Sequence, residues 1–170
     1  MKTFLISDTH FGHFNIIKHC NRPFYSINNM DKSIINNWNK VVSNEDVVYF
    51  LGDFCEIHHN PKYWLRYLNG NISFIEGNHD HPLKKYHVRP LNKHFVISYK
   101  EEKFLLCHYS NPSHPYSESI EFTWDGWVIH GHEHNHTPLI NKRKKRLNVS
   151  CENLNYTPIE IGALLQMRNK

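Results

Sequence analysis

The chain has 170 residues, of which 39% are hydrophobic, and a formal net charge of +4. This composition argues against an intrinsically disordered chain and predicts a single domain spanning residues 1–170. The apolar residues after Met1 are too few for a signal peptide or a membrane-spanning helix, so we expect a soluble protein that is not exported.

Short runs of apolar residues, rich in β-branched and aromatic side chains, predict the strands. In chain order these runs are Thr3–Ser7, Val47–Leu51, Ile72–Ile75, Phe95–Tyr99, Phe104–Cys107, Trp127–His130, Leu147–Ser150 and Ile159–Ile161. Helical spacing of the apolar residues from Ile34 to Val42 predicts a first helix, with Asp31 placed to cap it. A second helix is opened by Pro61, and a short third one is predicted over 163–168. The pattern suggests an α/β fold in which a mixed sheet, or a pair of sheets, is covered by helices.

Cysteine and histidine usage limits the chemistry of the chain. The cysteines are scattered and form no Cys-x-x-Cys pair, which argues against a zinc ribbon or a redox motif and favours reduced thiols in a cytoplasmic protein. Fifteen histidines are an unusual number and raise the expectation of a metal site. The tryptophans are expected in the core rather than as stacking surfaces for bases.

Residues able to bind metal follow five of the predicted strands. They are Asp8 and His10, Asp53, Asn78, His108, and finally His132 and His134. Ligand sites in open α/β sheets lie at the carboxyl ends of strands, so these exits could converge on one place. The set is too large for one ion, and two ions roughly 3.5–4 Å apart that share a carboxylate suit displacement at phosphorus. Nitrogen and oxygen ligands without thiolate favour Mn, Fe, Ni, Zn or Co.

These blocks, taken in order, resemble the calcineurin-like metallophosphoesterases. That family carries Asp-x-His, Gly-Asp, Gly-Asn-His-Asp/Glu, His and Gly-His-x-His, and the present chain matches all five blocks between Asp8 and His134. The resemblance implies a four-layer α/β sandwich in which two mixed sheets are flanked by helices. It also implies an enzyme, a metal-dependent phosphoric ester hydrolase.

The resemblance further assigns roles to individual residues. One metal is held by Asp8, His10, Asp53 and His134, and the other by Asp53, Asn78, His108 and His132, so that Asp53 bridges them. The resemblance also implies that a hydroxide shared by two divalent ions would attack phosphorus, with Mn²⁺ as the first candidate for the ions. His79 is implied as the general acid for the leaving group, and Asp80 as the residue that orients it.

The chain departs from the Ser/Thr protein phosphatases of the family. Glu76 stands where that branch has an arginine, and Phe54-Cys55-Glu56 follows Asp53 in place of its Asp-Arg-Gly. The resemblance therefore leans towards small bacterial and phage members of the phosphodiesterase branch, which open with a similar Asp-x-His-x-Gly-His.

Several residues outside the ligand blocks have two interpretations. His13 and Arg22 could contact the substrate phosphate, or else cap a turn and pair with a surface carboxylate. Asn148 and Glu152 could orient metal-bound histidines, or simply belong to a polar strand face, and His130 is expected in a supporting or packing role. His114 could rim the pocket. The basic run 142–146 is expected at a hairpin tip, with a nucleic-acid contact as the alternative.

Two other functions compete with a phosphodiesterase. A phosphomonoesterase acting on nucleotides or phosphoproteins would use the same metals, and only the pocket distinguishes the two activities. A non-catalytic scaffold of the same fold is disfavoured because all ligand positions and His79 are present. A nucleotide is a candidate substrate, nucleic acid is weakly supported, and no membrane partner is expected.

Overall fold

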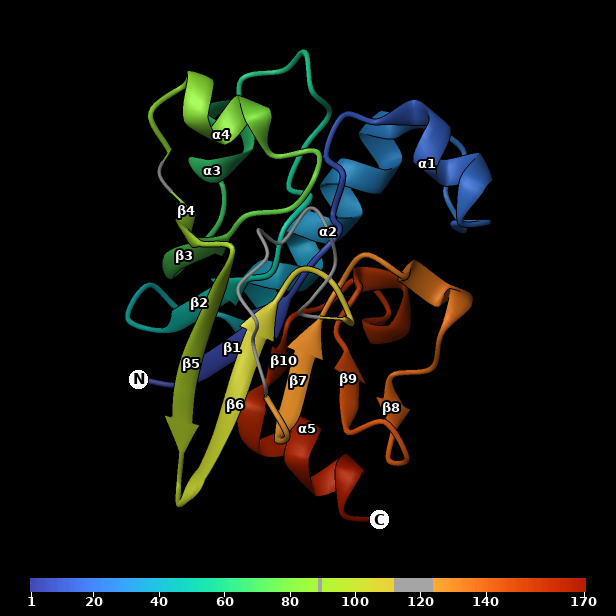
Figure 1. The fold of residues 1–170 in the computed structure, drawn as a ribbon. Coiled ribbons are helices and arrows are strands. Elements are labelled where there is room, and N and C mark those ends of the chain that lie inside the picture. The colour runs from blue at the N-terminus through green and yellow to red at the C-terminus, as the bar shows by residue number, and fades with distance from the viewer. Residues whose placement is uncertain (89, 112–123) are drawn as a thin grey trace.

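The computed structural model describes residues 1–88, 90–111 and 124–170 and has an α/β fold with two five-stranded mixed sheets (Figure 1). The first sheet has the order β10-β1-β2-β3-β4. Its strands are β1 (Thr3–Ile6), β2 (Val47–Phe50), β3 (Asn71–Ile75), β4 (Pro90–Asn92) and β10 (Ile159–Glu160). Strands β1 to β4 are parallel, and β10 runs antiparallel to β1.

The second sheet has the order β5-β6-β7-β9-β8. Its strands are β5 (His94–Tyr99), β6 (Glu102–Cys107), β7 (Trp127–His130), β8 (Ile140–Asn141) and β9 (Arg146–Asn148). The three central strands are parallel, whereas the edge strands β5 and β8 run antiparallel to their neighbours. The expectation of two mixed sheets with helices outside is confirmed.

The side chains of β2 show that the first sheet lies between the second sheet and a helix. The ring of Tyr49 stacks on Phe95 of the second sheet, with centroids 6.3 Å apart, while the ring of Phe50 stacks on Trp38 at 6.4 Å. Successive residues of a strand point to opposite faces, so one face of the first sheet meets the second sheet and the other meets a helix. Buried residues of both sheets, including Leu5 and Ile129, share one core.

The helices are α1 (Phe14–His19), α2 (Ile27–Val41), α3 (Lys62–Leu65), α4 (His81–Lys85) and α5 (Ile161–Arg168). The expectation that Asp31 caps the first long helix is wrong. Helix α2 begins four residues earlier, where the Ser26 hydroxyl accepts a hydrogen bond from the Asn29 N–H at 3.1 Å. Asp31 lies inside the helix and is buried. Two 3₁₀ helices, η2 (His134–His136) and η3 (Cys151–Leu154), complete the elements used below.

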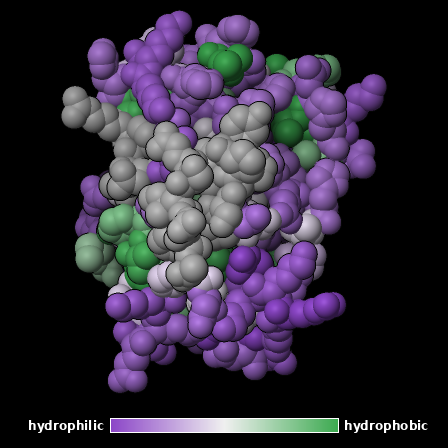
Figure 2. Space-filling view, viewed as in Figure 1, coloured by the Kyte–Doolittle hydropathy of each residue, from purple (hydrophilic) through white to green (hydrophobic). Residues whose placement is uncertain are grey.

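The basic run forms the turn between β8 and β9, as expected. Two of its cations have partners: Lys145 donates to the Asp125 carbonyl at 2.7 Å, and Arg146 donates to the Ser110 carbonyl at 2.5 Å. Among the described residues no helix is long and apolar enough to cross a membrane. The face shown in Figure 2 is mostly hydrophilic, with hydrophobic side chains showing over β5, where Phe95 and Val96 are partly exposed.

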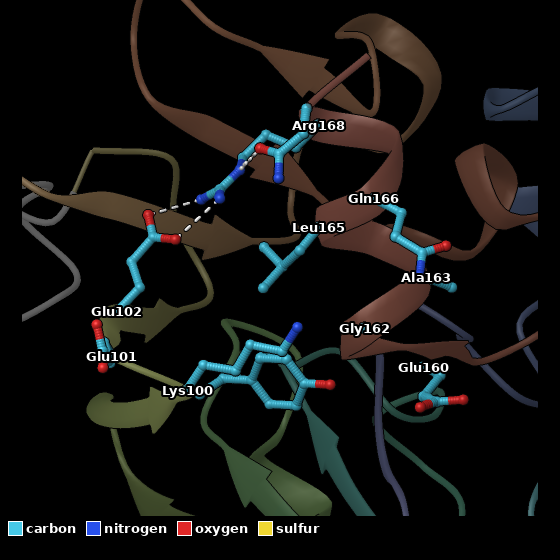
Figure 3. Close-up of a pocket in the computed structure, with 11 residues that line it drawn as sticks. Lys100, Glu101, Glu102, Glu160, Gly162, Ala163, Leu165, Gln166 and Arg168 are labelled. Carbon is cyan, nitrogen blue, oxygen red and sulfur yellow. Dashed lines mark hydrogen bonds and ion pairs between the residues drawn. The ribbon is translucent and has the colours of Figure 1, made fainter.

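A cavity of about 580 Å³ lies between α5 and the turn that joins β5 to β6 (Figure 3). The Arg168 guanidinium crosses it and makes two hydrogen bonds to Glu102, at 2.7 and 2.8 Å. This end of the molecule is opposite to the end at which β6 and β7 finish (Figure 1). The cavity is therefore remote from the predicted site.

Candidate metal centre

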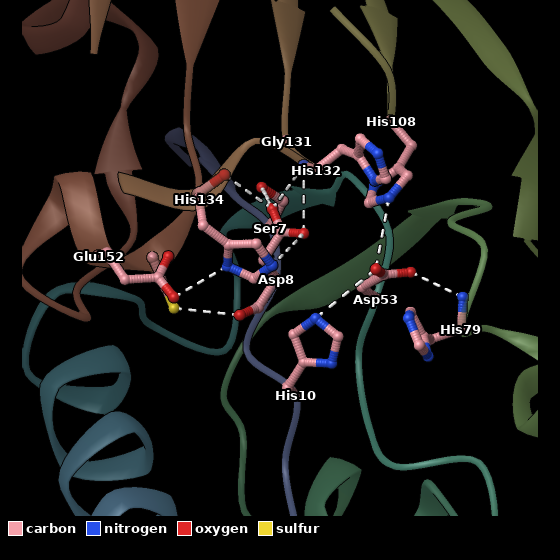
Figure 4. A network of polar contacts seen from close by, with 12 residues as sticks. Ser7, Asp8, His10, Asp53, His79, His108, Gly131, His132, His134 and Glu152 are labelled. Carbon is pink, nitrogen blue, oxygen red and sulfur yellow. Dashed lines mark hydrogen bonds and ion pairs between the residues drawn. The ribbon is translucent and has the colours of Figure 1, made fainter. Parts of the chain in front are cut away.

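The segments that follow β1, β2, β3, β6 and β7 meet at one end of the two sheets (Figure 4). Backbone hydrogen bonds join them. The Asp8 N–H donates to the Gly52 carbonyl at 2.9 Å, and the Gly131 N–H donates to the His108 carbonyl at 3.0 Å. The His132 N–H donates to the Asp8 carboxylate at 3.0 Å, which links the second sheet to the first. The strand exits singled out in the sequence therefore lie together.

The described ligand-type side chains form three groups, of which one, Cys20, His134 and Glu152, shares His134 with a group of predicted ligands. The other two groups consist of predicted ligands alone. Asp8, His10 and His134 make up the first, and within it the potential ligand atoms lie within 4.8 Å of one another. The second group, defined by the same distance, consists of Asp53, His108 and His132. We call these groups the first and the second cluster.

Asp53 lies between the two clusters. Its Oδ2 is 3.4 Å from His108 Nε2 in its own cluster and 3.6 Å from His10 Nε2 in the other. The Asn78 Oδ1 lies 3.1 Å from His108 Nε2, on the side of the second cluster. One carboxylate is thus within reach of both groups.

Three of the imidazoles, those of His10, His108 and His134, have an Nε2 atom near a carboxylate of the clusters. The His108 Nδ1 lies 2.8 Å from the Leu51 carbonyl, which can only accept, so Nδ1 carries the proton there. The His134 Nδ1 lies 2.9 Å from Glu152 Oε1 in the same way. The His10 Nε2 is buried and has no hydrogen-bond partner among the described residues. Buried nitrogen lone pairs beside carboxylates fit divalent cations, so these residues suit the divalent metals expected from the sequence.

The pKa values of Asp53 and His108 in the second cluster are shifted by the charges close to them. Burial raises the pKa of Asp53, but the neighbouring His108 and His10 outweigh this and bring it below its ordinary value. For His108, burial lowers the pKa, and the Asp53 carboxylate overcomes that effect and raises it to about 9. These directions favour an ionised Asp53 and a protonated His108, and a metal ion bound at this cluster would have to displace that proton.

Several of these residues have strained backbones. Asp8, His10, Asp53, His132 and His134 all have positive φ, between 46° and 68°. Non-glycine residues seldom adopt this left-handed region, and such outliers concentrate at functional sites. Gly131 has a different constraint, because a Cβ there would collide with the Asp8 carboxylate and the Ser7 hydroxyl.

His79 lies beside the clusters without belonging to either. Its ring centroid is 5.2 Å from that of His10, and its backbone N–H donates to Asp53 Oδ1 at 2.8 Å. The expectation that Asp80 orients the His79 ring needs correction. The buried Asp80 carboxylate accepts from the backbone N–H groups of Asp53, Phe54 and Gly77 at 2.8 to 2.9 Å. Asp80 therefore joins the β2 and β3 exits, and among the described residues it makes no hydrogen bond to the His79 ring.

The expected phosphate contact of Arg22 also needs correction. The Arg22 side chain has no exposed surface. Its Nε and Nη2 donate to Glu152 Oε1 at 2.9 and 2.7 Å, and its other bonds include the carbonyls of Asp8 and Thr9. These contacts hold the guanidinium inward. They also provide the hydrogen-bonding partners without which burying a cation would be costly. Arg22 therefore supports the first cluster through Glu152 and does not face the solvent.

Residues around the ligands include some that the sequence left undecided or missed. Glu152 and Asn148 both contact His134. The Glu152 carboxylate lies at the His134 Nδ1, and the Asn148 side-chain amide donates to the His134 backbone carbonyl at 2.8 Å. Ser7 and Ser150 were missed, and both hydroxyls donate to Asp8 Oδ2, at 2.5 and 2.9 Å. Serine at a strand end has no distinctive pattern, so only the fold could identify this pair.

The remaining candidates lie around the clusters. The half-buried His13 has its Nδ1 3.5 Å from His10 Nδ1, at the edge of the first cluster. His130 is buried, with its Nδ1 2.9 Å from the Gly131 carbonyl, and belongs to neither cluster. Cys20 lies close to His134 and Glu152, on the outer side of the first cluster. His114 is outside the described residues.

Comparisons with known proteins agree with this geometry. A sequence model of the calcineurin-like phosphoesterase superfamily domain matches residues 1–153. An uncharacterised protein of Methanocaldococcus jannaschii, MJ1445, is 44% identical over 176 residues, which cover 99% of this chain and 92% of that protein.

Solved structures share the fold. The crystal structure of a protein of unknown function from Aquifex aeolicus, AQ665, has a TM-score of 0.74 and 27% identity, and the match covers 98% of both chains. A novel archaeal phosphodiesterase has a TM-score of 0.50 and 20% identity over 95% of this chain and 99% of that one, a likeness of fold alone. With the family match covering most of its length, the chain belongs to the calcineurin-like phosphoesterase superfamily, whose members are generally metal-dependent phosphoesterases.

Proposed function

We propose that this protein is a phosphodiesterase that uses two divalent metal ions. The observation that carries the proposal is the pair of clusters with Asp53 between them. Asp8, His10 and His134 would hold one ion, Asn78, His108 and His132 the other, and Asp53 both. Divalent ions held there supply Lewis acidity and activate water towards phosphorus. The nitrogen and oxygen donors make Mn²⁺ a suitable first choice.

The chain's own residues supply proton transfer and orientation. His79 is outside both clusters but next to them, so its ring is available to donate a proton to the leaving oxygen. Asp80 fixes the backbone that carries Asp53, and Glu152 fixes the ring of His134. His13, at the rim, is proposed to contact the substrate phosphate.

The placement of Arg22 favours a diester over a monoester. A monoester dianion gains more from an additional cation than a diester monoanion does. The arginine expected to supply that cation is bound to Glu152 and has no exposed surface. A phosphodiester carries less negative charge than a monoester, so it needs less compensation from the cations that the site still offers.

Hydrolysis of bis-p-nitrophenyl phosphate, compared with p-nitrophenyl phosphate, tests this proposal directly. The protein stripped with a chelator should be inactive, and Mn²⁺ should restore turnover that is faster on the diester. Faster turnover of the monoester would favour the phosphomonoesterase alternative. Inactivity on both esters with Mn²⁺, Fe²⁺, Co²⁺, Ni²⁺ and Zn²⁺ would instead support a non-catalytic scaffold.

Replacing Glu152 by glutamine should weaken metal binding at the first cluster only. The substitution keeps the shape of the side chain but removes the charge that holds His134 Nδ1 and pairs with Arg22. Such supporting partners typically contribute 10–100-fold to metal affinity. Titration calorimetry with Mn²⁺ should therefore resolve one site weakened by roughly that factor and one unchanged site.

A second glutamate–arginine pair provides the control. Glu102 binds Arg168 at the opposite end of the sheets, and Glu102→Gln should leave both sites as in the parent protein. Unchanged affinity in Glu152→Gln, with the fold intact by circular dichroism, would remove Glu152 from the proposed machinery.

A further inference from the structure

A groove lined by aromatic residues opens beside the loop that carries His10. One cavity of about 410 Å³ is lined by Gly12, His59, Asn60, Tyr63 and Trp64, among others. A second, of about 330 Å³, shares Tyr63 and Trp64 and continues between α2 and α3 to Tyr67. We call the surface formed by Gly12, His59, Asn60, Tyr63, Trp64 and Tyr67 the aromatic groove. Its volume is in the range of small-molecule sites.

The walls of the aromatic groove are suited to a flat ring. The rings of His59 and Tyr63 meet that of Trp64 edge-on, with centroids 5.5 and 5.3 Å away. Tyr63 of α3 and Tyr67, in the turn that follows α3, are exposed at 56% and 47%. The two rings meet edge to face with centroids 6.1 Å apart, and the Arg66 Cζ lies 4.9 and 4.8 Å from the two centroids, although Arg66 lines neither cavity. Exposed tyrosines combined with an arginine are a typical surface for stacking a nucleobase.

The floor of the groove is fixed to the loop that bears the metal ligands. Buried Asp31 accepts from the Gly12 N–H at 3.2 Å and from Trp64 Nε1 at 2.9 Å. Gly12 lies so close to Trp64 that an added Cβ would stand 2.9 Å from its ring. The groove therefore cannot shift independently of the first cluster.

The distance along the chain also suits a nucleotide. Gly12 follows His10 by two residues, so their Cα atoms lie at most about 7 Å apart. Gly12 also lines one of the two cavities, so that end of the groove is adjacent in the chain to a residue of the first cluster, and the sugar of a nucleotide would lie between the two. Polar groups at the mouth can contact the edge of a base. The exposed Asn60 uses its Oδ1 to accept from the Lys62 N–H at 3.0 Å, and Lys32 lies along the second cavity.

From this arrangement we infer that the aromatic groove is a nucleoside subsite. It takes the base and sugar of a nucleotide phosphodiester whose phosphate lies at the metal centre, with the base stacked on Tyr63. The inference rests on the proposed phosphodiesterase function and names its substrate class.

Two esters with the same leaving group separate the subsite from the chemistry. Thymidine 5′-(p-nitrophenyl phosphate) carries a nucleoside, and methyl p-nitrophenyl phosphate does not. The parent protein should prefer the nucleoside ester in kcat/KM. Tyr63→Ala should reduce kcat/KM on that ester by roughly 5- to 100-fold and leave the methyl ester unchanged, since stacking on one aromatic side chain has this effect.

Matched variants and a binding assay complete the test. Tyr63→Phe keeps the ring and should retain the preference, and Tyr25→Ala removes an exposed tyrosine that lines neither cavity. Quenching of intrinsic fluorescence by thymidine 5′-monophosphate reports binding without turnover. If pentathymidylate quenches the fluorescence more strongly than thymidine 5′-monophosphate, the substrate is a nucleic-acid strand. If the two quench equally, the substrate is a free nucleotide. Both results support the subsite.

The outcomes distinguish the two proposals. If the esters are hydrolysed but Tyr63→Ala changes neither preference nor quenching, the nucleoside subsite is wrong and the phosphodiesterase stands. If neither ester is hydrolysed while nucleotide binding depends on Tyr63, the proposed activity is wrong and the subsite stands. Absence of both hydrolysis and binding overturns both.

Discussion

Asp53→Asn should empty both metal sites and lower turnover of bis-p-nitrophenyl phosphate by at least about 10³-fold, because the metals supply several kcal/mol of transition-state stabilisation. The Asp53 Oδ2 lies between His10 and His108, at 3.6 and 3.4 Å, so a single carboxylate serves both clusters. An asparagine has the same shape but carries no charge and has only one oxygen. Elemental analysis after dialysis should show the loss of metal directly.

The control for this variant is an exposed aspartate. Asp125→Asn changes a side chain that is fully exposed and pairs with Lys145, so it should keep two ions and full activity. The buried charge removed in Asp53→Asn is also a partner of His108, so thermal unfolding of both variants should be compared. A folded Asp53→Asn protein that still binds two ions would contradict the bridging role.

His79→Ala should retain both metals and still lose roughly 10²–10⁴-fold in turnover, the usual effect of removing a general acid. Its ring stands outside the clusters, and the hydrogen bond to Asp53 comes from its backbone N–H, which alanine keeps. The ligand geometry should therefore be preserved while proton donation is lost.

The leaving group provides a sharper test of the same role. p-Nitrophenolate departs with little help from an acid, whereas an alkoxide needs a proton. The defect of His79→Ala should therefore be smallest on p-nitrophenyl esters and grow with the basicity of the leaving group. His81→Ala, an exposed histidine two residues further on, serves as the control. A defect of equal size on all esters would argue for a binding role of His79 instead.

The sequence predicts the strands and their exits well because both are local patterns. Apolar runs mark the central strands, and β7 has the predicted bounds. Short elements with little apolar character escape prediction: α1 and α4 have six and five residues, and β4 and β8 three and two. Their formation depends on neighbours that are distant in the chain.

The partners of charged side chains are harder to predict than the elements. Arg22 and Glu152 are 130 residues apart, and only the packing of η3 against the β1 exit brings them together. An arginine after the first ligand block equally suits phosphate, so its burial could not be read from the sequence. The exposure of Tyr63 and Tyr67 could not be predicted for a related reason, because it depends on how the short helix α3 packs against α2.

The two-sheet origin of the ligands has a consequence for engineering this protein. Asp8, His10, Asp53 and Asn78 follow strands of one sheet, and His108, His132 and His134 follow strands of the other. The spacing of the two proposed ions would then depend on the packing of both sheets, because close-packed interiors transmit strain. Displacements of about 1 Å can cost a reaction 10²-fold, so repacking the interface between the sheets would retune the catalyst without altering a single ligand.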